Sequence, residues 1–295
     1  MSALPDPDFS LTASGNLRRR AVVSRLIETG ATAAAVLAVA VLGILVYYVA
    51  SQGIGAISWT FLTSSLPPPF GTGSGIGPAI AGTGEIVAFA TLIALPVGVL
   101  TALYLSEFAG GRVASVVKLL VDMLNGIPTI VTAVVVYGLI VLAFGESGFA
   151  GSVALSIVMV PLITRASLEA LVRVPGTLRE AADALGVGRW RTVVGVIIPG
   201  AMGGILTASI LAAARAAGET APLLICDSLF GPGLQLNPFK AMPNIPFAIL
   251  ALTEQGSASA TQTAWGAAFV LLFAILVANV GARALVARSN RRSGR

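Results

Sequence analysis

Residues 180–222 decide the fold of this chain. The segment begins with the polar stretch EAADALG (180–186), passes Pro199, and continues as an apolar run that carries Arg215 and Glu219. The 16 residues from Pro199 to Arg215 span about 24 Å as a helix with a rise of 1.5 Å per residue. This length predicts a helix that crosses most of a bilayer, with a polar segment before it and two charges near its far end.

The composition is that of a membrane protein. Of 295 residues, 56% are hydrophobic and only 11% are charged, and the mean hydropathy is +0.92. Soluble domains carry about 25% charged residues. Six apolar runs could cross a hydrocarbon core of about 30 Å, and they lie near residues 29–50, 84–105, 120–143, 149–164, 199–221 and 263–286. We therefore predict an all-α integral membrane protein with six transmembrane helices.

The basic residues predict the orientation. With the N-terminus inside, the cytoplasmic segments hold 16 of the 18 lysines and arginines, which leaves Lys240 outside and Arg215 within a span. By the positive-inside rule, both termini are predicted to be cytoplasmic. The net charge of +5 could suggest nucleic acid, but this distribution favours topology and contact with anionic lipid instead.

The predicted order along the chain follows from these spans. A cytoplasmic tail (1–28) precedes the first transmembrane helix (29–50), whose apolar run exceeds the 7 to 15 residues of a cleavable signal peptide and is expected to remain uncleaved. An external loop (51–83) leads into a transmembrane domain (84–286), which contains a cytoplasmic loop (165–198) and is followed by a basic cytoplasmic tail (287–295). Asp227 and Glu254 are expected to be solvated charges of an external loop.

Several site classes are excluded by residue types that are missing. Histidine is absent and Cys226 is the only cysteine, which excludes an intrachain disulfide, a Cys/His zinc site and a His-dependent triad. The only lysines, Lys118 and Lys240, are followed by Leu and Ala, so neither completes a GK[ST] phosphate loop. No nucleophile and base pair stands out, which disfavours an intramembrane enzyme. We expect no cofactor or metal in this chain, so another subunit would have to bind any ATP that it uses.

The predicted cytoplasmic loop carries a motif with specific spacing. Glu180-Ala181-Ala182 is followed after three residues by Gly186, and after nine more by Val196-x-Ile198-Pro199. This spacing resembles the EAA loop of binding-protein-dependent ABC importer permeases, which usually end it with Ile-x-Leu-Pro. The resemblance implies a MetI-like permease fold and contact with a separate ATPase. The implied contact residues are Glu180, Ala181, Ala182, Asp183, Leu185 and Gly186.

The residues favour such a contact independently of the resemblance. Leu178, Ala181, Ala182 and Leu185 follow i, i+3, i+4, i+7 spacing, which predicts one apolar face on a short helix. Gly186 is predicted to end this helix, as a C-terminal glycine does. Small residues beside a terminating glycine allow a helix to lie deep in a groove of a partner. The alternative is an ordinary amphipathic cytoplasmic loop.

Two further features predict polar groups within the membrane. An arginine at the depth of Arg215 costs about 2.5 to 3.5 kcal/mol on insertion scales, so it needs a partner or a polar cavity. Glu219, four residues later, is expected on the same helix face as that partner. The third span has an interrupted start at residues 125–129 (NGIPT). Irregular backbone at this depth requires protein or water around it, so we expect it to face the interior of the bundle.

Residues 218–222 (GETAP) after an arginine, together with residues 125–131 (NGIPTIV), resemble the PstA family of permeases in phosphate-specific ABC importers. The likeness covers roughly residues 80–285, and the family usually has serine where Thr129 stands. It implies a phosphate path in which Arg215 engages the anion, as its planar donors fit phosphate oxygens, and Glu219 positions the anion or neutralises the arginine. Thr220, Asn125 and Thr129 are the other implied path residues. A structural Arg215–Glu219 clasp that never touches substrate is the alternative.

The resemblance also implies a location and partners. It implies a multi-pass protein of the cell membrane that works with a second, PstC-like permease, a PstB-like ATPase dimer that binds ATP and Mg²⁺, and an external PstS-like phosphate-binding protein. The residues leave open whether two copies of this chain pair instead. They also leave open a permease for sulfate, molybdate or phosphonate, which would share the loop but have a different pocket. An ion-coupled secondary transporter would leave the EAA spacing without a purpose.

Overall fold

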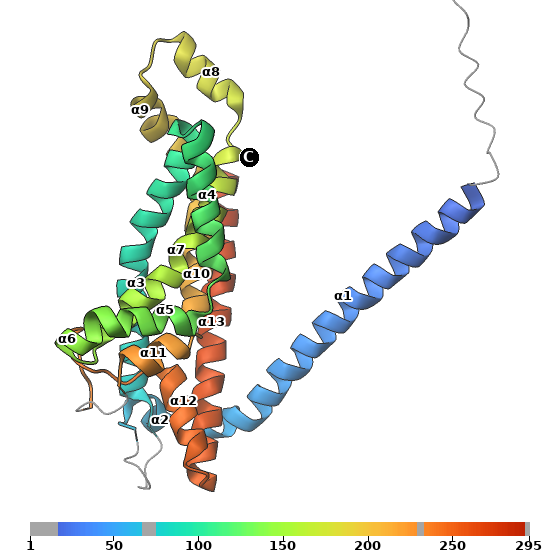
Figure 1. Cartoon of the computed structure of the whole chain (residues 1–295). Helices are drawn as coiled ribbons and strands as arrows, with labels where there is room; N and C mark the ends of the chain where they lie inside the picture. Colours follow the sequence, from blue (N-terminus) through green and yellow to red (C-terminus); the bar gives the residue numbers. More distant parts are fainter. Residues whose placement is uncertain (1–16, 67–74, 229–232, 293–295) are drawn as a thin grey trace, which may run out of the picture. The chain divides into compact units, whose positions relative to one another are not determined.

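The computed structural model describes residues 17–66, 75–228 and 233–292, and these residues form helices and connecting segments without any β-strand (Figure 1). The chain divides into two units, residues 1–49 and 50–295. The first unit contains most of helix α1 (Leu17–Gly53), which begins at Leu17, earlier than the predicted residue 29. Leu37 and Leu42 are among the apolar side chains on the surface of this helix. Residues 1–16 of the predicted tail lie outside the described residues.

The second unit consists of long helices and of short helical segments that connect them. In chain order they are η1 (Ile54–Ala56), α2 (Trp59–Thr63), α3 (Gly77–Leu103), η2 (Tyr104–Phe108), α4 (Gly111–Gly126), α5 (Thr129–Val136), η3 (Tyr137–Val141), α6 (Leu142–Phe144), α7 (Gly148–Val172), α8 (Gly176–Ala184), α9 (Arg189–Thr192), η4 (Val193–Ile197), α10 (Ile198–Ala216), α11 (Ala221–Cys226), α12 (Ile245–Glu254) and α13 (Ala258–Arg292). The segments η2, η3 and η4 are single π-helical turns. Helix α13 runs through most of the predicted basic tail, and residues 293–295 lie outside the described part.

Five helical stretches among the described residues are long and apolar enough to cross a membrane. They are Arg19–Ala56, Gly77–Phe108, Gly148–Val172, Arg189–Ala216 and Ala258–Ala284, and α4 with α5 makes a sixth if this bent pair is counted as one span. The fold prediction of an all-helical membrane protein is thus confirmed. The third span differs from the predicted run over 120–143, because α4 already starts at Gly111 and meets α5 at an angle of 98°.

The bend has a local cause. Pro128 has no backbone N–H and its ring disfavours helical geometry at the preceding residue. Ile127 accordingly has extended backbone angles, φ −72° and ψ 129°, and ends α4. Helix α5 then starts at Thr129 with Pro128 as its N-cap. The sequence therefore predicted the position of the break correctly. It did not predict the change in helix direction, because a count of apolar residues carries no information on angles.

The fifth predicted span also has different ends. It was expected over 199–221, yet the helical stretch begins at Arg189 and includes Pro199 in the first turn of α10, directly after η4. A proline at this position fits, since the first turn of a helix needs no N–H from it. Helix α10 ends at Ala216, and α11 starts separately at Ala221.

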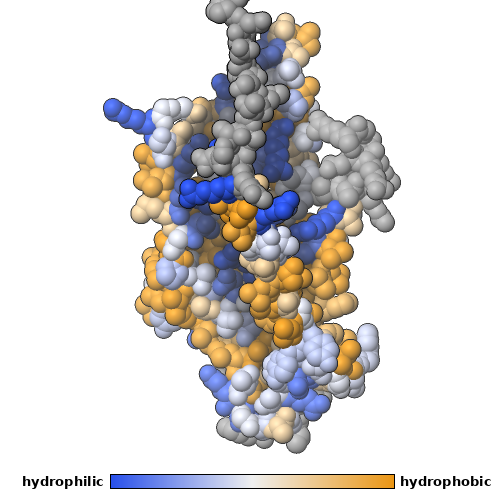
Figure 2. Space-filling view, turned by 90° about the vertical axis from the view of Figure 1, so that its right-hand side faces the viewer, coloured by the Kyte–Doolittle hydropathy of each residue, from blue (hydrophilic) through white to orange (hydrophobic). Residues whose placement is uncertain are grey.

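The core of the second unit lies between α3 and α7, which pack along their lengths. Ile86 of α3 and Leu155, Met159 and Ile163 of α7 are buried there. Close packing depends on Gly98, because a Cβ at this position would lie 2.8 Å from Cγ2 of Ile163. The face drawn in Figure 2 shows broad hydrophobic areas interrupted by hydrophilic groups. Within this unit, α8 and α9 lie at one end, whereas α2 and α12 lie at the other (Figure 1).

Candidate functional site

The predicted ATPase-contact residues lie on and after α8, at one end of the second unit (Figure 1). Ala182 is buried, 7% exposed. The remaining five residues are exposed: Glu180, Ala181, Asp183, Leu185 and Gly186. Leu185 is 81% exposed and Trp190 of α9 is 61% exposed. Large apolar side chains at the tip of a polar segment are typical of a docking surface.

Gly186 ends α8 in the predicted way. Its φ is +68°, in the left-handed region that favours glycine. The N–H of Gly186 donates to the carbonyl of Asp183, and the N–H of Val187 donates to the carbonyl of Ala182, each at 3.0 Å. These two bonds form a Schellman motif, which satisfies carbonyls at the end of the helix. The direction in which the chain leaves α8 is therefore set by this glycine.

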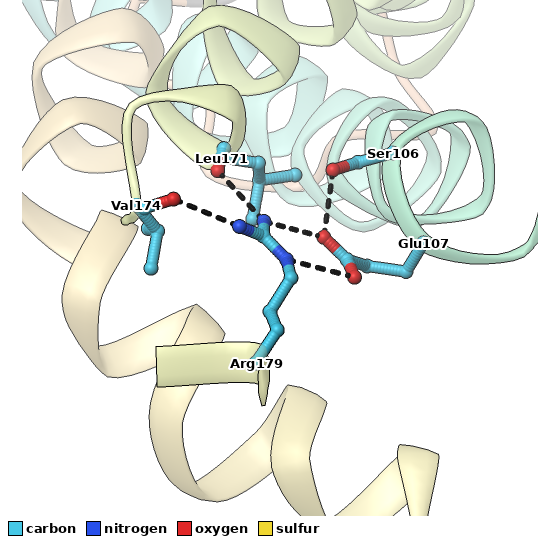
Figure 3. Close-up of polar contacts among 5 residues, drawn as sticks. All are labelled: Ser106, Glu107, Leu171, Val174 and Arg179. Carbon is cyan, nitrogen blue, oxygen red and sulfur yellow. Dashed lines mark hydrogen bonds and ion pairs between the residues drawn. The ribbon is translucent and has the colours of Figure 1, made fainter. Parts of the chain in front are cut away.

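The start of α8 is attached to the membrane helices by Arg179 (Figure 3). Its Nη2 and Nε donate to Glu107 Oε1 and Oε2 of η2 at 2.8 Å and 3.3 Å. Its Nη1 also donates to the carbonyl of Val174 at 2.8 Å, and Nη2 to that of Leu171 at 3.2 Å. Glu107, only 5% exposed, further accepts a hydrogen bond from Ser106 Oγ at 2.8 Å. Sequence reasoning missed this group, since Arg179 counted only as one more cytoplasmic arginine.

The predicted ion pair of Arg215 and Glu219 is present, but in another setting than expected. Arg215 Nε lies 3.9 Å from Glu219 Oε1. Because α10 ends at Ala216, Glu219 belongs to the irregular connection to α11 and not to the same helix face. The Arg215 side chain is 64% exposed and that of Glu219 is 20% exposed, so the arginine is not buried within this chain. It lies in the last turn of α10, where the helix dipole favours a cation.

The bend between α4 and α5 places the other predicted path residues at the surface of this chain. Asn125 is exposed and Thr129 is partly buried. Helices of this chain do not cover the interrupted segment, because residues 125–128 are all exposed. The reason is the 98° turn, which leads α5 away from the line of α4.

Two helix breaks, the bend between α4 and α5 and the gap between α10 and α11, are linked through the short helices that follow them. Helix α11 packs against α5, with Cys226 Sγ donating to the carbonyl of Ala133 at 3.4 Å. Both residues are buried in one cluster with Val136. Among the described residues, no hydrogen bond or ion pair joins Asn125 or Thr129 to Arg215, Glu219 or Thr220. The structure thus packs α5 against α11, the helices that follow the two breaks, and leaves Asn125 and Arg215 exposed, whereas Thr129, Glu219 and Thr220 are partly buried.

A cleft of about 310 Å³, lined by both apolar and charged residues, lies between η2, α4 and α7. Its charged lining residues are Lys118, Asp122, Arg165 and Glu169. Arg165 Nε donates to Asp122 Oδ1 at 3.0 Å, which ties α7 to α4. Thr164 Oγ1 also lines the cleft and, within the described structure, is buried without a hydrogen-bond partner. Sequence reasoning did not single out this cleft, because its residues come from segments more than 40 positions apart.

Asp227, which directly follows α11, is not the solvated charge that was predicted. It is 1% exposed and accepts hydrogen bonds from the N–H of Met242 at 3.0 Å and from Asn244 Nδ2 at 3.4 Å. Burial raises the pKa of this carboxyl to about 6. Asp227 therefore holds the segment before α12 against the end of α11. Glu254 is exposed, as predicted.

Comparison with known proteins shows the family of the chain. Residues 94–295 match the family model described as binding-protein-dependent transport system inner membrane component. The chain is 35% identical over 242 residues to the phosphate transport system permease protein PstA of Yersinia pestis, which covers 81% of each chain. It is 36% identical over 246 residues to PstA 1 of Mycobacterium tuberculosis (strain CDC 1551 / Oshkosh), which covers 81% of this chain and 80% of the relative.

A solved structure shares the fold. The MetNI methionine ABC transporter in inward-facing conformations superimposes with a TM-score of 0.57 and 21% identity, over 72% of this chain and 93% of that one. The MetI-like fold predicted from the EAA spacing is confirmed by this likeness. The chain therefore belongs to the binding-protein-dependent transport system inner membrane components, within the PstA family of permeases.

Proposed function

We propose that this chain is the transmembrane permease subunit of an ATP-driven importer of inorganic phosphate. The observation that carries the proposal is the combination of an exposed EAA helix, α8, at one end of the unit with an exposed arginine at a helix break, Arg215. Relatives with more than a third of their aligned residues identical are named phosphate transport system permeases. An ATP-independent transporter would have no use for a docking helix of this form.

The ATPase is a separate subunit in this proposal, and it brings ATP and Mg²⁺. Both lysines of the chain lack the context of a phosphate loop, as Lys118 and Lys240 are followed by Leu and Ala. The exposed Leu185 and Trp190 offer the ATPase an apolar contact, and Glu180 and Asp183 surround it with charge. We place this end, and both termini, in the cytoplasm on the positive-inside distribution.

The other partners are a second permease and an external binding protein. The family is named for its dependence on a binding protein, and relatives belong to phosphate transport systems. Arg215 and Asn125 lie exposed on this chain in spite of their polarity. Because lipid contact would be costly for both, we propose that a PstC-like permease faces them and encloses a polar path. An external PstS-like protein would deliver the phosphate to that path.

In this path Arg215 binds the anion and Glu219 acts as its counter-charge when no anion is present. The separation of 3.9 Å between Arg215 Nε and Glu219 Oε1 is longer than a good charge-assisted hydrogen bond, so the guanidinium keeps donors for phosphate oxygens. Thr220, which precedes α11, adds a hydroxyl beside this pair. Asn125 and Thr129 add an amide and a hydroxyl at the bend of α4 and α5.

The test is phosphate uptake by proteoliposomes that contain the complete complex, with ATP inside and the binding protein outside. Hydrogen bonds to a charged group contribute about 1.5 to 3 kcal/mol. We therefore expect Arg215→Gln to lower uptake at subsaturating phosphate at least about tenfold, as 1.4 kcal/mol corresponds to a factor of ten. Arg215→Lys keeps the charge but not the planar donors, and we expect an intermediate rate.

Lys240→Gln is the matched control, because Lys240 is an exposed basic residue outside the proposed path. Its uptake is expected to equal that of the native complex. Normal uptake by Arg215→Gln would refute the assignment of Arg215 to the path. Loss of complex assembly in the same variant would assign the residue to a structural clasp with Glu219. Uptake by vesicles that contain this chain alone would refute the proposed function.

A further inference from the structure

Arg179 joins three separate elements at the cytoplasmic end of the second unit (Figure 3). It belongs to α8, its carboxylate partner Glu107 belongs to η2 at the end of α3, and its carbonyl partners Leu171 and Val174 lie at the end of α7. The last carbonyls of an α-helix have no partners within the helix. One guanidinium therefore caps α7 and pairs with α3 at the same time.

The geometry of this group is rigid. An arginine presents its N–H donors in a fixed plane, and four of its hydrogen bonds are used here. Glu107 is buried, and Ser106 fixes one of its oxygens. Neither end of the ion pair can rotate without breaking several bonds together. The first turn of α8 is thus held to η2 and to the end of α7 by the same side chain.

A second contact attaches α9, the other helix of the α8–α9 segment. The guanidinium carbon of Arg189, the first residue of α9, lies 5.5 Å from the centre of the Phe108 ring. A cation at this distance is attracted to the face of the ring. Helices α8 and α9 therefore contact adjacent residues, Glu107 and Phe108, in one π-helical turn. Such turns are frequent at functional sites.

The helices that receive these contacts pack closely against each other. Helices α3 and α7 pack along their lengths, and Gly98 brings their backbones close at Ile163. A well-packed interface of this kind does not deform continuously. A push on Glu107 thus reaches the core of the unit and not only the end of α3.

We propose that Glu107 and Arg179 form a linkage through which displacement of the α8–α9 segment by the ATPase moves α3 and α7 together. Both are positioning residues, which contact neither phosphate nor ATP. The inference rests on the proposed function of the chain as a permease driven by a separate ATPase. It adds to the EAA residues, which receive the force, the residues that pass it on.

The test measures the phosphate imported per ATP hydrolysed by the reconstituted complex. The variants are Glu107→Gln, Arg179→Gln and the double variant. Coupling between sites commonly changes an affinity or activity by about 5- to 150-fold, so we expect each single substitution to lower this ratio by about fivefold or more. The double variant is expected to be no worse than the more affected single variant, because all three remove the same linkage.

Arg173→Gln is the matched control. Arg173 is an exposed arginine of the same connection between α7 and α8, and its side chain makes no ion pair among the described residues. Its ratio is expected to equal that of the native complex. The ATPase should copurify with every variant. Arg179→Gln leaves Glu107 buried and unpaired, so the double variant, which leaves no buried charge, carries the test if that single variant fails to assemble.

Three results would overturn the proposal: an unchanged ratio in assembled variants, effects of the two substitutions that multiply in the double variant, or an ATPase that is lost from the double variant.

A second readout needs no transported substrate. Spin labels at Thr177→Cys of α8 and Leu100→Cys of α3 occupy exposed positions. Their separation should stay constant through the ATPase cycle with the linkage intact and change in the double variant.

This readout also separates the inference from the function on which it rests. A native complex that hydrolyses ATP without importing phosphate would refute the proposed function, while the label separation would still report on the linkage. A separation that changes during the cycle in the native protein would refute the linkage even if the complex imports phosphate.

Discussion

Replacement of Gly186 tests the docking segment, because its role depends on backbone geometry alone. Its φ of +68° lies where a residue with a Cβ is strained by about 1 to 2 kcal/mol. No atom lies within 4 Å of a Cβ built at this position, so no steric clash adds to the strain. We expect Gly186→Val to destabilise the Schellman ending of α8 by this amount or somewhat more, since valine is β-branched.

The expected effect on binding follows from this strain. A cost of about 1 to 2 kcal/mol lowers the population of the native loop about 5- to 30-fold if alternative loop conformations lie close in energy. The apparent affinity for the ATPase falls by the same factor. It can be measured by titration of the purified permease complex with the ATPase, together with phosphate-stimulated ATP hydrolysis.

Two variants make this test specific to the left-handed conformation. Gly188→Ala is the matched control, because Gly188 has a φ of −61° and a Cβ there also meets no atom within 4 Å. Gly186→Asn should stay close to the native protein, as asparagine tolerates positive φ. If Gly186→Val bound the ATPase as tightly as Gly188→Ala does, our reason for placing the contact at the end of α8 would be removed.

Two further predictions concern stability in detergent. Gly82→Ala should lower the free energy of unfolding by about 1 to 3 kcal/mol, since its Cβ would lie 2.0 Å from the carbonyl oxygen of Pro243. Gly84→Ala, with open space around it, should be neutral or slightly stabilising in thermal melts. Equal melting temperatures of the two variants would contradict this prediction. The raised pKa of Asp227 favours its protonated form in the folded state, so the native protein should lose up to about 3 kcal/mol relative to Asp227→Asn as pH rises from about 4 through 6. Melting curves at both ends of this range test it, and parallel pH dependences of the two proteins would refute it.

Much of the fold follows from local patterns in the sequence. Apolar runs located the membrane helices, and Gly186 marked the end of α8, because helix length and capping depend on neighbouring residues. The bend at Pro128 was visible as an interruption, but its angle of 98° was not. Proline shows where a helix breaks, whereas the direction of the next helix depends on tertiary packing, here of α5 against α11.

The site was predicted less completely than the fold. The pair of Arg215 and Glu219 could be found because its members are four residues apart. Glu107 and Arg179 are 72 positions apart, and each has an ordinary context in the sequence. Nothing local distinguishes Arg179 from Arg173, although only the former pairs with a buried carboxylate in the described structure. Such partners become visible only when the ends of α3 and α7 are placed together.

The π-helical turn η4, which lies between α9 and α10, sets the direction in which the side chains of α9 point relative to those of α10. Val193–Ile197 carries one more residue per turn than an α-helix would, and each residue of an α-helix advances the side-chain direction by about 100°. Removing a single residue there would regularise the backbone and swing Arg189 away from the Phe108 ring. If the α8–α9 segment docks the ATPase as proposed, the number of residues in this turn sets the direction in which the segment points, as much as any side chain does.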